Sequence, residues 1–322
     1  MPAPTLYEKL RWRVHEYSAQ VPYWMAENGL LPGSREYRPF ILLCDIRTGS
    51  NMLASYLRSH SNVLMLSEIF KHSDSKVYFS VDGFRTRARD DEVVALRDTD
   101  PVQFLEQEVF RTYPAYLEAV GFKLLYTQAR SQKMWWDGPE YADWWEHMDD
   151  RHRTVWREAH SDVWSYLRSR TDVKIIHLVR QNLLRQKLSA KMAQTTNTWG
   201  KPADASSNPD DKPQVRLDPE TCRRDFAAKE RMRREAEEHF ERHDLLQVSY
   251  EQLTDTPSET LRRIQRFLSL RVEPLQTEKR KQETRSLHEA ISNYEALHGA
   301  LADTPWARFF DDADPEHEVD AT

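Results

Sequence analysis

A run of apolar residues that passes through a glycine turn directly into a helix limits the folds open to this chain. Residues 40–46 read Phe-Ile-Leu-Leu-Cys-Asp-Ile, and such a run is typical of a strand buried on both faces of a parallel sheet. The polar residues 47–51, Arg-Thr-Gly-Ser-Asn, follow, and apolar residues return at helical spacing over 52–57. The pattern predicts an α/β protein with a P-loop-like parallel sheet flanked by helices.

The predicted turn at residues 47–51 has the properties of an anion site. The N–H groups in the first turn of a helix have no partner within the helix, and the helix dipole favours negative charge at that end. Arg47 adds a guanidinium group, a fixed positive fork, at the mouth of the turn. We therefore expect this turn to bind a phosphate.

The same turn differs from the phosphate loop of nucleotide triphosphatases. A Walker A loop has a lysine and then a serine or threonine after its second glycine, so that the hydroxyl reaches Mg²⁺. Here Ser50 and Asn51 follow Gly49, and the basic residue, Arg47, precedes it. The order of residues points away from kinases and ATPases, and we expect a site that works without a metal.

A second strand end carries another cationic group. Residues 173–179 are predicted to form a buried strand, which is followed by Arg180, by Asn182 as a helix cap, and by a helix that contains Ser189. A guanidinium fork and a hydroxyl donor suit one phosphate group. This segment therefore predicts a second phosphate site.

Two further charged residues lie in or just after predicted strands. Glu68 follows the short apolar run 62–66, and a carboxylate beyond a strand end is where α/β enzymes place their chemistry; a solvated surface position is the alternative. Lys123 lies inside the apolar run 120–126. Burying an unpaired ammonium group is expensive, so Lys123 is expected either to face a bound anion or acceptor or to emerge at an edge of the sheet.

Composition excludes several classes of protein. The net charge is −6, from 46 basic and 52 acidic residues, which disfavours binding to nucleic acid. The two cysteines, Cys44 and Cys222, form neither a disulfide framework nor a metal-binding pattern. No apolar run has the length of a membrane span and no signal peptide is evident, so we expect a cytoplasmic protein. The sequence leaves the oligomeric state open, a homo-oligomer included.

Three other segments carry structural expectations. Residues 134–164 hold six of the ten tryptophans, which would either line an acceptor pocket or pack against one another in a helical insertion. Residues 223–242 predict a charged helix with few apolar positions, and hence an exposed one. Residues 254–268 predict a helix with an apolar face.

The turn at residues 47–51 resembles the 5′-phosphosulfate loop of sulfotransferases that use 3′-phosphoadenosine 5′-phosphosulfate (PAPS). Carbohydrate and bacterial members of that family carry Arg-(Thr/Ser)-Gly-Ser-(Thr/Ser), and Asn51 departs from the pattern. Four more segments resemble the family in the same order, over roughly residues 40–310. They are Glu68 before Phe70, Gly-x-Lys-Leu at 121–124, Arg180 with Ser189, and Tyr-Glu-x-Leu at 250–253.

The resemblance implies a role for each matching residue. It implies that Glu68 is the catalytic base, that Arg47 and Lys123 take part in catalysis, and that Tyr250 lies near an adenine, with core packing as the alternative for Tyr250. It implies a closing loop in which Lys281 and Gln282 approach the nucleotide, although a solvated cationic run would look the same. The expected binding residues for the nucleotide are Arg47, Thr48, Gly49, Ser50, Asn51, Met52, Arg180, Ser189, Tyr250, Lys281 and Gln282.

The implied function is transfer of the sulfuryl group of PAPS to a hydroxyl of a carbohydrate, glycolipid or other small metabolite, with PAP as the product. A P-loop small-molecule kinase and a non-catalytic PAP-binding or scaffold protein are the alternatives. The whole chain, 1–322, is expected to be a single sulfotransferase domain. Within it we expect an N-terminal helical extension (1–38), an α/β core (39–310) and an acidic tail (311–322).

Overall fold

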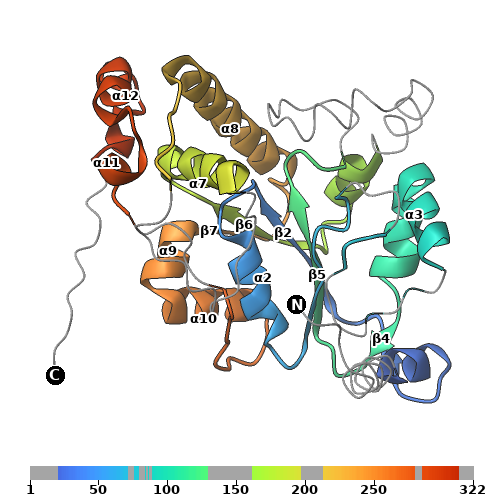
Figure 1. Cartoon of the computed structure of the whole chain (residues 1–322). Coiled ribbons are helices and arrows are strands. Elements are labelled where there is room, and N and C mark those ends of the chain that lie inside the picture. Colours follow the sequence, from blue (N-terminus) through green and yellow to red (C-terminus); the bar gives the residue numbers. More distant parts are fainter. Residues whose placement is uncertain are drawn as a thin grey trace, which may run out of the picture.

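The computed structural model describes residues 21–71, 76–79, 84, 86, 89–129, 162–196, 213–279 and 285–311. Within these residues, five strands form a parallel sheet in the order β3–β5–β2–β6–β7 (Figure 1). Along the chain they are β2 (Arg38–Cys44), β3 (Val63–Met65), β5 (Ala119–Leu125), β6 (Lys174–Val179) and β7 (Leu245–Ser249). The predicted parallel α/β sheet is confirmed.

Helices follow or connect most of these strands. Helix α2 (Ser50–Arg58) follows β2, and α7 (Leu183–Thr196) and α8 (Pro219–His239) lie between β6 and β7. The other helices are α3 (Asp90–Thr99), α4 (Pro101–Phe104) with a π-helical turn (Leu105–Val109), α9 (Tyr250–Asp255), α10 (Pro257–Phe267), α11 (Leu287–Ala290), α12 (Tyr294–Leu301) and a 3₁₀ turn (Ala307–Phe309). Residues 21–27 and 162–169 are also helical. A small antiparallel pair joins β1 (Gly33–Ser34) to β4 (Tyr113–Pro114).

Apolar clusters cover the two faces of the sheet. On one face, Phe40 and Leu42 of β2 pack with Leu53 of α2 and Ile264 of α10. On the other face, Ile41 of β2 belongs to a cluster supplied by α4, the helix at 162–169 and the second half of α8. In Figure 1, α3 accordingly lies on the far side of the sheet from α9 and α10. Burial on both faces explains why β2 reads as a continuous apolar run.

Helix α8 corrects the expectation that the charged segment 223–242 is exposed. The helix buries Cys222, Phe226, Met232 and Ala236. Its first half packs with α7, α11 and α12, and its second half packs on the sheet. These four buried positions in 21 residues anchor the helix although most of its residues are charged or polar.

Two predicted boundaries also change. The strand predicted at 40–46 ends at Cys44, so Asp45 already belongs to the turn. The single helix predicted at 254–268 is two helices, because Pro257 begins α10 and the residue before a proline avoids the helical conformation. The N-terminal extension up to residue 20, most of the tryptophan-rich stretch and the tail beyond residue 311 lie outside the described residues.

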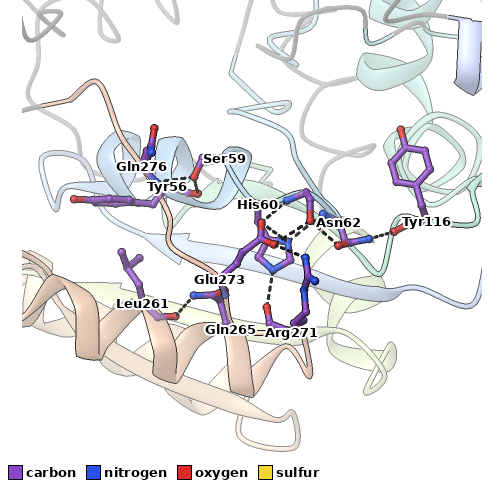
Figure 2. Close-up of polar contacts among 11 residues, drawn as sticks. Tyr56, Ser59, His60, Asn62, Tyr116, Leu261, Gln265, Arg271, Glu273 and Gln276 are labelled. Carbon is purple, nitrogen blue, oxygen red and sulfur yellow. Dashed lines mark hydrogen bonds and ion pairs between the residues drawn. The ribbon is translucent and has the colours of Figure 1, made fainter.

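The segment after α10 returns to the end of α2, as Figure 2 shows. His60 is 3% exposed, and its Nε2 lies 3.0 Å from the carbonyl oxygen of Arg271. The backbone N–H and the hydroxyl of Ser61 donate to the two carboxylate oxygens of Glu273, at 2.8 and 3.1 Å. These contacts hold the chain against α2 shortly before residues 280–284, which lie outside the described part.

None of the helices in the described ranges combines the length and the apolarity needed to cross a bilayer.

Candidate functional site

The two predicted phosphate sites lie side by side. Strands β2 and β6 are hydrogen-bonded neighbours, so the residues that follow them meet at one edge of the sheet. The Nη1 of Arg180 donates to the carbonyl oxygen of Arg47 at 3.2 Å, and the Nε of Arg47 donates to the hydroxyl of Ser189 at 3.0 Å. The guanidinium of Arg180 lies over the ring of Tyr250, 4.3 Å from its centroid. The structure therefore brings together four residues from three separate predicted segments.

The backbone of the turn after β2 is shaped for an anion. Arg47 and Gly49 both have left-handed φ angles, 59° and 82°, and such a turn directs successive N–H groups towards one point. The N–H groups of Met52 and Leu53 donate to the Gly49 carbonyl, whereas those of the two residues before them lie in the first turn, where a helix offers no carbonyl. Helix α2 has no acidic residue in this turn and no capping side chain. The helix end therefore suits a bound phosphate.

The hydroxyl groups of the turn point into the protein. Thr48 is 1% exposed and donates to the carbonyl oxygen of Asp45 at 2.8 Å. Ser50 is 6% exposed, and its side chain hydrogen-bonds to Cys44. Both residues therefore shape the turn with their side chains and can meet a ligand through their backbone N–H groups. Burial raises the pKa of the Cys44 thiol to about 12, so it stays protonated.

Electrostatics at this edge favour a negatively charged ligand. Burial and the neighbouring Arg180 guanidinium both lower the pKa of Arg47, burial being the larger cause. Two adjacent guanidinium groups repel each other, and an anion between them removes that repulsion. Burial also raises the pKa of Tyr250, which therefore remains neutral and offers an uncharged aromatic face.

Glu68 and Lys123 form an ion pair beside the turn. The Nζ of Lys123 lies 2.6 Å from Oε1 of Glu68 and donates to Oδ1 of Asn51 at 2.6 Å. The Nε2 of Gln128 donates to the other oxygen of Glu68 at 3.1 Å. Because β5 is an inner strand, the alternative that Lys123 emerges at a sheet edge is wrong. Lys123 instead links the carboxylate to the first turn of α2.

This arrangement leaves the carboxylate accessible while fixing its orientation. The side chain of Glu68 is 21% exposed, and that of Lys123 is 2% exposed. The backbone N–H of Lys123 donates to the carbonyl of Ser67 at 3.1 Å, so the chain continues alongside β5 beyond the end of β3. A carboxylate held in this way can accept a proton from a group bound next to the turn.

Sequence reasoning missed the residues that support the turn. Asp45 is 5% exposed; it accepts hydrogen bonds from the N–H of Ile46 at 2.7 Å and from Nε2 of Gln186 at 2.8 Å, and it pairs with Lys229 of α8. Gln186 also donates to the Ile46 carbonyl at 2.7 Å. The carboxylate of Asp45 at the end of an apolar run was a usable signal, but nothing in the charged sequence of α8 marks Lys229.

The remaining predicted residues fall in two groups. Met52 is half-buried and packs beside the apolar cluster between α2 and the sheet. Lys281 and Gln282 lie outside the described residues. Trp164, from the tryptophan-rich stretch, is buried, and its indole N–H donates to the carbonyl of Gln128 at 2.9 Å. This tryptophan therefore belongs to the core below the site.

Comparisons with known proteins find matches that cover most of this chain. The model of a family described as the sulfotransferase family matches residues 39–274. Nodulation protein H of Rhizobium meliloti strain 1021 is 25% identical over 280 residues, which cover 85% of this chain and 95% of that protein. Nodulation protein H of Rhizobium tropici is 27% identical over 277 residues, covering 85% and 93% of the two chains. The matched family segment contains both strand-end arginines, Glu68 and Lys123.

Proposed function

The chain belongs to the sulfotransferase family, and on that premise we propose that it transfers the sulfuryl group of PAPS to a hydroxyl of a carbohydrate, glycolipid or other small metabolite. One observation carries the proposal: Arg47, Ser189 and Arg180 meet where two neighbouring strands end. PAPS carries a 3′-phosphate and a 5′-phosphosulfate, and so needs two cationic grips within the reach of one small molecule.

The proposed binding mode assigns one grip to each end of the nucleotide. Arg47 and the N–H groups at the start of α2 hold the 5′-phosphosulfate, in keeping with the left-handed turn at residues 47–49. Arg180 and Ser189 hold the 3′-phosphate through a charged fork and a hydroxyl. Tyr250, already stacked under Arg180, lies next to the adenine. The resemblance adds Lys281 and Gln282, outside the described residues, as further residues that bind the nucleotide.

The proposed transfer is an in-line displacement at sulfur. The acceptor oxygen forms a bond to sulfur while the bond from sulfur to the bridging oxygen of the 5′-phosphate breaks, and PAP leaves. Negative charge builds on the bridging oxygen, and Arg47 with the helix N–H groups neutralises it. The proton of the acceptor hydroxyl passes to the carboxylate of Glu68. Lys123 keeps that carboxylate beside Asn51 and therefore beside the turn.

We propose one catalytic domain over the whole sequence, acting without a metal, on a small-molecule acceptor and not on nucleic acid, as a monomer or a homo-oligomer. We place it in the cytoplasm, since Cys44 and Cys222 are both free and buried, which suits a reducing compartment.

A direct assay tests this function. Purified protein is incubated with ³⁵S-labelled PAPS and a panel of sugars, glycolipids and hydroxylated metabolites, and PAP is tested separately for its effect on the melting temperature. We expect PAP to stabilise the protein, labelled sulfate to appear on an acceptor, and transfer to persist in EDTA. A Mg²⁺-dependent transfer from ATP would instead identify a kinase. Binding of PAP with no transfer to any acceptor would identify a non-catalytic PAP-binding protein.

The contact between Gly49 and Tyr250 gives a prediction about the turn. A Cβ at Gly49 would lie 2.6 Å from Cδ2 of Tyr250, on a residue whose φ is +82°. We expect Gly49→Ala to lower the free energy of unfolding by about 1–3 kcal/mol and to weaken PAP binding, because Tyr250 has to move. Urea unfolding and calorimetric titration with PAP measure the two effects.

Gly29→Ala is the matched control for that variant. Gly29 has a φ of +69°, and a Cβ added there would meet no atom within 4 Å, so the substitution brings the same backbone strain without the contact. We expect it to lose stability but to keep its affinity for PAP. Equal PAP affinity in the two variants would contradict the role given to the Gly49–Tyr250 contact.

A further inference from the structure

A cavity of about 690 Å³ lies between α7 and α8 and opens beside the turn after β2. Its lining includes Ile46, the residue immediately before Arg47, and Gln186, which donates to the Ile46 carbonyl. Cavities of this size are typical of sites for small molecules. The cavity therefore ends at the residue that precedes the turn at 47–51.

The charge of the cavity lining is opposite to that of the whole chain. The chain has more acidic residues than basic ones, 52 against 46. Among the described lining residues, six are Lys or Arg and two are Asp. The six cationic residues are Lys187, Lys191, Arg216, Arg224, Lys229 and Arg231, and the two aspartates are Asp218 and Asp225. The described lining of this cavity therefore carries a net positive charge, although the whole chain carries a net negative one.

The inner charges of the cavity are neutralised within the protein. Lys187 forms an ion pair with Asp225, and Lys229 forms one with Asp45. Asp218 caps α8 by accepting from the N–H of Thr221 at 2.8 Å. That hydrogen bond is the largest cause of the lowered pKa of Asp218, which is therefore a fixed anion with a structural partner. Of the other cationic side chains, Arg231 pairs with Glu235 at 3.9 Å, and Arg216 and Arg224 both act on Asp218. The described lining as a whole still carries more positive than negative charge.

Two cationic side chains of the lining stand at the rim, where a ligand can meet them. Lys191 on α7 and Arg216 just before α8 are both exposed, and they come from opposite walls of the cavity. Ala190, Ala228 and Met232 add apolar atoms to the lining. The lining thus combines polar residues beside the turn, apolar residues and exposed cationic residues.

We infer that this cavity binds the acceptor and that the acceptor carries a carboxylate or phosphate in addition to the hydroxyl that receives the sulfuryl group. The inference rests on the proposed function and narrows its substrate class. The hydroxyl end lies towards Ile46 and the turn, the carbon skeleton packs on the apolar residues of the lining, and the anionic group meets Lys191 and Arg216. A neutral molecule of the same shape leaves the two cationic side chains without that contact.

A binding experiment with PAP at saturation tests the inference. Melting temperatures of the PAP complex are measured with glucuronate, glucose 6-phosphate and shikimate, and with the neutral counterparts glucose and shikimate methyl ester. The same panel is applied to the double variant Lys191→Gln/Arg216→Gln. Arg234→Gln is the control, because Arg234 is an exposed arginine of α8 that is absent from the described cavity lining.

We expect at least one anion of the panel to stabilise the PAP complex and its neutral counterpart to do so much less. The double variant should bind that anion about tenfold more weakly, the effect of losing two exposed charge contacts, while Arg234→Gln behaves like the parent protein. The inference is wrong if no anion stabilises the complex, if neutral and anionic probes act alike, or if the double variant keeps the preference. Failure of PAP itself to stabilise the parent protein would remove the proposed function instead.

Discussion

The Glu68→Gln variant is expected to bind PAP as tightly as the parent protein and to lose a factor of about 10²–10⁴ in kcat, the usual contribution of a general base. The amide has nearly the same shape as the carboxylate, and its oxygen can still accept a hydrogen bond from Lys123 or Gln128. It cannot take the proton of the acceptor hydroxyl. Calorimetry with PAP and initial rates of ³⁵S transfer separate binding from turnover.

A control is needed because Glu68→Gln also removes the charge partner of a buried ammonium group. Lys123→Met removes that ammonium group and leaves the carboxylate free to act as a base. If the loss in Glu68→Gln comes from proton transfer, the double variant Glu68→Gln/Lys123→Met stays as slow as Glu68→Gln. Recovery of turnover in the double variant would assign the loss to the stranded ammonium group, and unchanged turnover in Glu68→Gln would remove this residue from the mechanism.

The Arg47→Ala variant is expected to lower kcat by about 10²–10³, the range seen when one donor to a developing anion is lost. It should also weaken PAP binding, because Arg47 donates to Ser189 and helps to position that hydroxyl. Arg47→Lys keeps the positive charge without the fork, so we expect part of the rate to return. Turnover and PAP affinity are measured on the same preparations.

The matched control for Arg47→Ala is Arg262→Ala on α10. Arg262 is an exposed arginine whose Nε donates to the carbonyl of Ser258 at 3.1 Å, on the part of the helix that faces solvent. We expect this variant to keep full activity. Ser189→Ala should weaken PAP binding less than Arg47→Ala, because it removes a neutral hydroxyl and no charge. Normal rates in Arg47→Ala would contradict the assignment of this turn to the sulfuryl donor.

Patterns within short stretches of the sequence predicted the strands and the turn, because the formation of these elements depends mainly on residues close together in the chain. The apolar run at 40–43 and the largely apolar run at 175–178 are buried strands. The polar turn between strand and helix begins at Asp45, two residues earlier than predicted. Arg180 follows β6, and Ser189 lies on the next helix, α7. The guanidinium fork and the hydroxyl therefore lie in one continuous stretch of sequence and could be predicted together. Periodicity and strand-end position are local properties, which is why they could be recognised.

Such patterns could not predict contacts between residues that are far apart in the sequence. Lys123 and Glu68 are both visible as unusual charges near strands, but only the sheet order, with β5 between β3 and β2, makes them partners. The pair of Asp45 and Lys229 joins residues 184 positions apart. The break before Pro257 was different, since the proline itself marks it and the prediction overlooked the signal.

The position of Lys123 has a consequence for anyone who wishes to redesign this protein. The Nζ of Lys123 contacts both the side chain of Asn51, in the first turn of α2, and the carboxylate of Glu68, beyond β3. These three residues together therefore set the distance between the two elements. We expect substitutions at any one of these three positions to lower turnover. Substitutions are better made on α7 and α8, which line the cavity. New side chains there would change which acceptor binds and leave the contacts of Lys123 unchanged.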